Sequence, residues 1–179
     1  MRFAPAGMKI PLNYGALIAF AGIVVSLVGY LLGYHNDLEK FELGNRISQI
    51  ASLLISVIGI LLAMRAVRAQ SPDGSLSFGR AVGTGALVSL VSGAISAVYV
   101  LLYGLVINPE FHELILESAT SKMSAEQADA AAGMMRFFTG AIWTSLMVLN
   151  VSPIFGTLIS LIVALFVKKP AQTPPPIAA

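Results

Sequence analysis

Four long stretches of mostly apolar residues, separated by short charged segments, make up most of this 179-residue chain. They run over about residues 12–34, 47–64, 81–107 and 140–167, and the second is the shortest. A helix needs about 20 mostly apolar residues to cross roughly 30 Å of hydrocarbon. Charged residues form only 11% of the chain, against about 25% in soluble domains, so lipid must cover the excess apolar surface. The sequence therefore predicts an all-α integral membrane four-helix bundle, with residues 1–169 forming a single membrane domain.

The first apolar stretch has a second interpretation as a secretory signal peptide, because the basic residues Arg2 and Lys9 precede it. The apolar region of a signal peptide is about 7 to 15 residues long. Here 23 residues without a charge run from Leu12 to Tyr34, and no small-residue cleavage site stands out before His35. We expect a retained membrane span.

Basic residues are divided unequally between the two sides of the predicted bundle. Seven lie on the side of the N-terminus, namely Arg2, Lys9, Arg65, Arg68, Arg80, Lys168 and Lys169, and four on the other, namely Lys40, Arg46, Lys122 and Arg136. Cytoplasmic loops of membrane proteins carry the excess of lysine and arginine, so we expect a cytoplasmic N-terminus. An even number of spans returns the C-terminus to the same side. There the tail, residues 170–179, is rich in proline and alanine and is expected to be disordered.

The segment between the last two predicted spans, residues 108–138, has its own helical pattern. Asn108-Pro109-Glu110 is typical of a helix start. Apolar residues then recur near helical spacing, opposite Glu113 and Glu117, which predicts an amphipathic helix at the outer membrane surface. Ser124 and Gln127 have the spacing of a capping box. We expect a second helix to begin there and to continue into the last span.

Small residues recur along the spans at steps of three or four. The glycines of these stripes are Gly15, Gly22 and Gly29 in the first span, Gly85 and Gly93 in the third, and Gly156 in the fourth. Lipid removes most of the hydrophobic drive for helix pairing, so close packing depends on small side chains that let backbones approach. We expect these faces to pack within one bundle; homodimerisation is the alternative.

The spans hold few groups that could carry chemistry, since no Asp, Glu, Lys or Arg lies in the middle of any of them. That pattern disfavours a proton-coupled pump or a voltage sensor. The strongest polar candidate is a notch of Asn150, Ser152 and Pro153, where proline frees a carbonyl and bends the helix. Such a notch can bind a substrate or ion in transporters with broken helices. The alternative is a kink whose polar groups are satisfied locally.

Both histidines fall in the outer connections, His35 near Asp37 and Glu39, and His112 beside Glu113. If these connections met, they would compose a metal or acid–base site. His112-Glu113 lacks the second histidine that a zinc-protease helix requires, so a solvated acidic face is the favoured interpretation. The chain has no cysteine and a net charge of only +2, and it contains no nucleotide-binding or nucleophile motif. We therefore expect no catalytic residue, metal, cofactor or nucleic-acid partner.

Three short motifs carry a family resemblance: Ser77-Phe78-Gly79-Arg80-Ala81, Ile107-Asn108-Pro109-Glu110-Phe111, and the run from Gly156 through Ser160-Leu161-Ile162 to Lys168-Lys169. With Tyr14-Gly15, they make residues 8–169 resemble a bacterial family catalogued as domain of unknown function number 4199, found largely in Bacteroidetes. The resemblance implies a four-span, multi-pass protein of the bacterial inner membrane. It implies no activity, cofactor or site residue.

Two functional hypotheses follow. The first is a non-enzymatic accessory or interaction subunit, surrounded by membrane lipid, that contacts a protein partner through the outer acidic helix or the small-residue faces. The second is a small transporter or channel that uses the notch at Asn150, Ser152 and Pro153.

Overall fold

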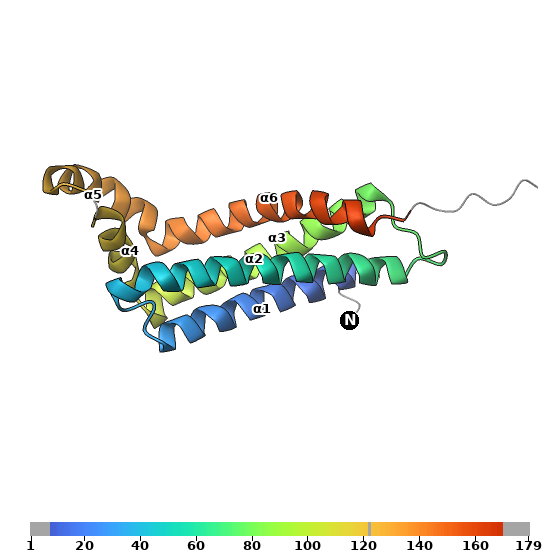
Figure 1. Ribbon diagram of the computed structural model, residues 1–179, viewed down its shortest axis with the longest axis horizontal. Coiled ribbons are helices and arrows are strands. Elements are labelled where there is room, and N and C mark those ends of the chain that lie inside the picture. The colour runs from blue at the N-terminus through green and yellow to red at the C-terminus, as the bar shows by residue number, and fades with distance from the viewer. Residues whose placement is uncertain (1–7, 122, 170–179) are drawn as a thin grey trace, which may run out of the picture.

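Four long helices lie side by side in the computed structural model and form an up-and-down bundle (Figure 1). They are α1 (Lys9–Leu31), α2 (Leu38–Ala69), α3 (Phe78–Leu102) and α6 (Ala141–Val167), and a π-helical turn, η2 (Tyr103–Ile107), extends α3. Each is long and apolar enough to cross a membrane, so the prediction of an all-α membrane bundle is confirmed. The structure describes residues 8–121 and 123–169; the expected disordered tail at 170–179 lies outside them.

The turn between α1 and α2 explains why the first helix ends before Tyr34. Gly33 adopts a φ of +82°, which glycine reaches without steric cost. The N–H of Gly33 donates to the carbonyl of Tyr30 at 3.0 Å, and the N–H of Tyr34 to that of Gly29 at 2.9 Å. This pair of hydrogen bonds closes a helix at a left-handed residue. The chain is then free to turn back into α2.

The second span differs most from its sequence-based bounds, because α2 contains 32 residues and is the longest of the described helices. Asp37 caps it by accepting a hydrogen bond from the N–H of Glu39 at 2.9 Å. At 1.5 Å per residue α2 is about 48 Å long, well beyond the roughly 30 Å of hydrocarbon. The apolar stretch 47–64 therefore marks only the part of this helix that suits lipid, and its charged first turns extend past it.

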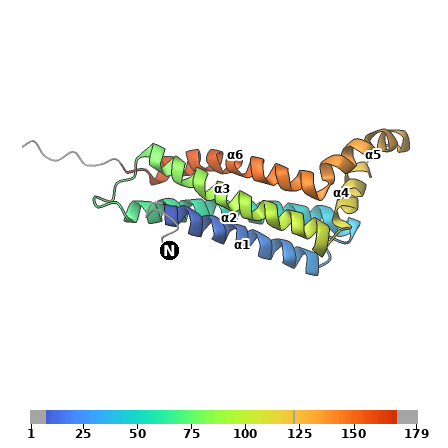
Figure 2. The same cartoon turned by 180° about the vertical axis from the view of Figure 1, so that it is seen from behind.

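Two shorter helices, α4 (Phe111–Thr120) and α5 (Ala125–Thr139), connect α3 to α6 and extend away from one end of the bundle, here called the α4 end (Figure 2). Ser124 and Gln127 form the predicted capping box: Ser124 Oγ accepts from the N–H of Gln127 at 3.4 Å, and Gln127 Oε1 accepts from the N–H of Ser124 at 3.3 Å. The expectation that this helix continues into the last span is wrong. Gly140, with a ψ of 147°, leaves the helical region and separates α5 from α6.

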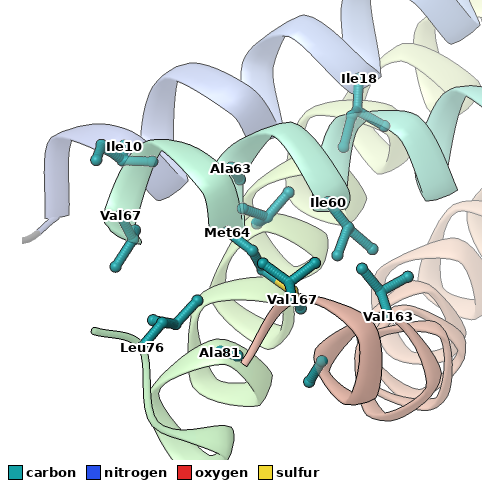
Figure 3. Close-up of a cluster of buried hydrophobic side chains, with 12 residues drawn as sticks. Ile10, Ile18, Ile60, Ala63, Met64, Val67, Leu76, Ala81, Val163 and Val167 are labelled. Carbon is teal, nitrogen blue, oxygen red and sulfur yellow. The ribbon is translucent and has the colours of Figure 1, made fainter. Parts of the chain in front are cut away.

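The apolar core lies toward the opposite end of the bundle, here called the Leu76 end (Figure 3). Buried side chains of all four long helices meet there, including Ile10, Ile60, Met64, Ala81 and Val163. Leu76, in the α2–α3 connection, exchanges two backbone hydrogen bonds with Lys169, just after α6, at 2.7 and 3.0 Å. These contacts tie the α2–α3 connection to the end of α6.

Glycine and serine residues face each other across the α3–α6 contact, which is the most extensive helix pairing in the described structure. The pairs are Gly85–Ser160, Gly156–Ser89 and Gly93–Ser152. Gly15 makes the equivalent approach of α1 to α3, where an added Cβ would lie 2.7 Å from the carbonyl oxygen of Val88. The other two glycines of the predicted stripes differ: Gly29 lies beside the ring of His35, and Gly22 has no neighbour within 4 Å of an added Cβ.

Candidate functional site

The middle of the bundle contains a partly open cavity of about 310 Å³, here called the central cavity. Six serine side chains line it: Ser26 of α1, Ser52 and Ser56 of α2, Ser92 and Ser96 of α3, and Ser152 of α6. Its other walls come mainly from aliphatic side chains and Tyr99, and none of the described residues that line it carries a charge. The cavity is therefore polar but uncharged.

Five of the six serine hydroxyls lack a hydrogen-bond partner within residues 8–121 and 123–169: those of Ser52, Ser56, Ser92, Ser96 and Ser152. The sixth, Ser26 Oγ, accepts from the Tyr99 hydroxyl at 2.9 Å. Serine in a membrane helix commonly bonds to the carbonyl four residues earlier. Ser89 and Ser160, outside the central cavity, do so at 2.9 and 2.6 Å. The cavity hydroxyls are thus left to bond with a molecule inside the bundle.

The central cavity continues toward the α4 end into a space of about 170 Å³, which shares Gly22, Ser26 and Ser52 with it. His35 and Phe111 line this space. The connected spaces are here called the hollow. The missing side chain of Gly22 contributes to the opening, since nothing lies within 4 Å of where its Cβ would be.

In the other direction the hollow ends against the apolar core. A space of about 150 Å³ shares Ser56, Ser92 and Ser152 with the central cavity. Its walls include Ile18 and Ile60, which belong to the buried cluster of the Leu76 end. The hollow therefore reaches the α4 end but not the Leu76 end.

A wider groove of about 640 Å³ opens between α2 and α6. It shares Ser52, Val148 and Ser152 with the central cavity. Both helices are candidate membrane spans, so the groove offers a lateral path from the central cavity to the membrane.

Hydrogen bonds at the α4 end tie the α1–α2 turn to the end of α3. Asn108, only 6% exposed, donates to the carbonyl of His35 at 3.0 Å, to Oδ1 of Asn36 at 2.9 Å and to the hydroxyl oxygen of Tyr103 at 3.4 Å. Tyr103 Oη lies 2.6 Å from His35 Nδ1. The tautomer of His35 sets the direction of this bond: the Tyr103 hydroxyl donates to an unprotonated Nδ1, or its oxygen accepts from a protonated Nδ1.

The His35 ring is held among aromatic side chains as well. Its centroid lies 4.7 Å from that of Phe111 and 5.6 Å from that of Tyr103. Partial burial lowers the pKa of His35 from its ordinary value of 6.5, because desolvation disfavours the charged ring. The lowered pKa favours the neutral form of the ring at neutral pH.

His112 differs from His35 in its hydrogen bonding: both of its ring nitrogens are buried without a hydrogen-bond partner among the described residues. Its Nε2 lies against Gly104, near Ala141 at the start of α6. The outer connections do meet, as Phe111 contacts His35. However, no group of three or more His, Cys, Asp or Glu residues within the described ranges could hold a metal ion.

The structure does not bring the three residues of the predicted notch together. Asn150 is exposed on α6, and its amide donates to the carbonyl of Leu146 at 2.7 Å, within the same helix. Ser152 instead lines the central cavity. Pro153 lies inside the helix and contacts the α3 face at Gly93. Only Ser152 of this set belongs to the cavity.

Sequence reasoning missed the ring of serines, although its signal was present. Ser52 and Ser56 of α2, and Ser92 and Ser96 of α3, each stand four residues apart on one helix face. This spacing is shared with residues that pack helices, as Ser89 and Ser160 do, so the sequence alone does not separate the two uses.

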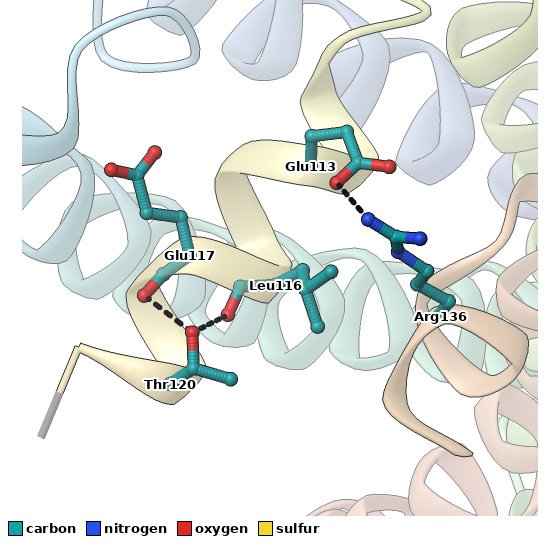
Figure 4. Close-up of polar contacts among 5 residues, drawn as sticks. All are labelled: Glu113, Leu116, Glu117, Thr120 and Arg136. Carbon is teal, nitrogen blue, oxygen red and sulfur yellow. Dashed lines mark hydrogen bonds and ion pairs between the residues drawn. The ribbon is translucent and has the colours of Figure 1, made fainter. Parts of the chain in front are cut away.

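Polar contacts also form within and between the outer helices (Figure 4). Glu113 of α4 and Arg136 of α5 approach to 4.0 Å, and both side chains are two-thirds exposed. Thr120 closes the end of α4 by donating to the carbonyl of Leu116 at 3.0 Å. No residue of α5 is buried; one face of the helix is half-buried against α4, and the rest is exposed outside the bundle.

Comparison with known proteins gives one match. No curated protein and no solved structure matches the chain. The sequence profile of the family described as "Protein of unknown function (DUF4199)" matches residues 13–169, which include all four candidate spans apart from the first residues of α1. The chain belongs to this family.

Proposed function

We propose that the protein is a small transporter that binds an uncharged polar group inside its bundle. The observation that carries this proposal is the set of serine hydroxyls without partners around the central cavity. Hydroxyl groups both donate and accept hydrogen bonds, which suits a hydroxyl or amide group of a ligand. A bare ion would lack a compensating charge among the described lining residues.

The apolar floor of the hollow favours a carrier over a permanently open channel. Ile18 and Ile60 close the path toward the Leu76 end, so passage requires the helices to rearrange. We propose a non-enzymatic role, since the described lining residues of the central cavity include no charged acid or base.

The test uses the absence of cysteine from the chain. Ser92→Cys and Ser96→Cys place single thiols in the cavity, and Val98→Cys, at a position 60% exposed on the lipid-facing side of the same helix, is the control. In proteoliposomes, a small neutral methanethiosulfonate should modify the cavity thiols, and glycerol should slow the reaction. Equal reactivity of all three variants, or no protection by glycerol, would contradict the proposal.

An interaction subunit is the second candidate function, favoured by the exposure of α5. Its C-terminal half bears large apolar side chains at Met134, Phe137 and Phe138, which are all exposed. Crosslinking in native membranes, followed by affinity purification, should recover a partner with the natural chain and lose it with Met134→Glu. An identical set of proteins with both would count against this role.

We also propose that the Leu76 end faces the cytoplasm of a bacterial inner membrane. The described basic residues at that end are Lys9, Arg65, Arg68, Arg80, Lys168 and Lys169, whereas acidic residues gather at the α4 end. Alkaline phosphatase fused to the C-terminus should be inactive, and a fluorescent protein fused there should fold. The reverse result would overturn this orientation.

A further inference from the structure

We propose that the ligand of the central cavity is an amphiphile dissolved in the membrane, with an uncharged polar head and one hydrocarbon chain, which enters between α2 and α6. This inference rests on the proposed function and names its substrate class. It follows from the way in which the groove between α2 and α6 joins the cavity.

The groove and the central cavity are continuous, because Ser52, Val148 and Ser152 line both. The groove is also the larger space, about 640 Å³ against about 310 Å³. Ser52 is exposed rather than buried, which places one of the unpartnered hydroxyls at the junction. A molecule in the groove can therefore reach the serine hydroxyls without passing through either end of the bundle.

The groove has the polarity that a hydrocarbon chain requires. Met147, Val151 and Phe155 of α6 form its apolar wall, whereas its polar lining comes from short uncharged side chains and Gln49. A chain lying along the apolar wall would place its head among the hydroxyls of the cavity. A purely water-soluble ligand would gain nothing from an apolar wall that opens toward lipid.

The same chemistry argues against a second copy of this protein as the occupant. A transmembrane helix inserted into the groove would cover the apolar wall and leave the hydroxyls of Ser52 and Ser152 without partners. Buried polar groups are almost always hydrogen-bonded. An uncharged head can bond to them, and a carboxylate would bring a charge that no described lining residue of the groove compensates.

The test uses a photoreactive monoacylglycerol, with a diazirine on its chain, added to the full-length protein in lipid nanodiscs. We expect labelled residues to lie on the facing sides of α2 and α6 along the groove. Unlabelled monoolein should compete, whereas oleate should not. Val151→Trp should reduce labelling by about tenfold or more by blocking the groove. Leu146→Trp, at a position 47% exposed on the side of α6 away from the groove-lining residues, should leave it unchanged.

A second variant guards against misfolding of Val151→Trp. Ser152→Ala adds no volume beside Gly93 and removes a hydroxyl shared with the cavity, so it should weaken labelling while the protein stays monodisperse. Even labelling over all lipid-facing residues would overturn the inference, as would disulfide crosslinking of Val151→Cys between two copies. Ser96→Cys separates the two proposals: if it still reacts with the water-soluble reagent and is protected by glycerol, the cavity proposal stands without lateral access.

Discussion

The hydroxyl oxygen of Tyr103 lies 2.6 Å from Nδ1 of His35, in a hydrogen bond that joins the end of α3 to the turn between α1 and α2. Partial burial lowers the pKa of His35 below 6.5, because desolvation disfavours the charged ring. Protonation would therefore place a partly desolvated charge in this turn. The α4 end of the bundle is therefore sensitive to pH.

We predict that the protein loses stability as the pH falls below about 6.5. The unfolded state then binds a proton at His35 that the folded state resists, so stability is greatest above this pH and decreases below it. Thermal unfolding in detergent between pH 8 and pH 5 measures the effect. His35→Gln should show a smaller decrease; the nearby Asp37–Lys40 ion pair, at 3.4 Å, is common to both proteins. Parallel curves would contradict the prediction.

Gly85 should not tolerate a side chain. An added Cβ would collide with Oγ and Cβ of Ser160 across the α3–α6 contact, so Gly85→Ala should lower the free energy of unfolding by roughly 1 to 3 kcal/mol. Gly83, two residues earlier on α3, has nothing within 4 Å of an added Cβ. Gly83→Ala should be neutral or stabilising, by up to about 1 kcal/mol. Chemical unfolding in mixed micelles compares the pair, and equal losses would refute the assignment of this contact.

We predict that the buried imidazole of His112 lowers the free energy of unfolding of the protein. Its two ring nitrogens are buried without partners in the described structure, and an unsatisfied buried polar group costs about 1 to 3 kcal/mol. His112→Leu should therefore stabilise the protein by at least about 1 kcal/mol. His112→Gln, which keeps polar atoms at the position, should not. A destabilised leucine variant would mean that the imidazole makes a needed interaction.

The sequence alone was sufficient to predict those features that depend on a single continuous segment of the chain. Apolar length located the four spans, and the Ser124–Gln127 spacing identified the capping box. It did not locate the start of α2, because the cap at Asp37 lies ten residues before the apolar stretch and four of the nine intervening residues are charged. It also missed the break at Gly140, since glycine is compatible with either a continuous or an interrupted membrane helix.

The site was harder to predict, because it depends on which faces of different helices meet. Asn150 and Ser152 are two residues apart, and on a helix this spacing directs them to different sides. The structure accordingly places Asn150 outside and Ser152 inside. The same limit applies to glycine: the sequence grouped Gly15 with Gly22, but only the first lies against a neighbouring helix. A small residue allows either close helix packing or a cavity, and which of the two occurs depends on how the helices are arranged around it.

Gly22 should therefore control access to the central cavity without supporting the fold. It lines both the central cavity and the space that leads to the α4 end. Gly22→Leu should fill part of this hollow, since no atom lies within 4 Å of the added Cβ. It should leave thermal stability within a few degrees of the natural protein and slow the modification of a thiol at Ser96→Cys. Gly15→Leu is the matched control, because its side chain would collide with Val91 and the backbone of Val88, and it should impair folding. If Gly22→Leu left the thiol as reactive as before, water would reach the cavity by another path, and the groove between α2 and α6 would be the path to probe by the same method.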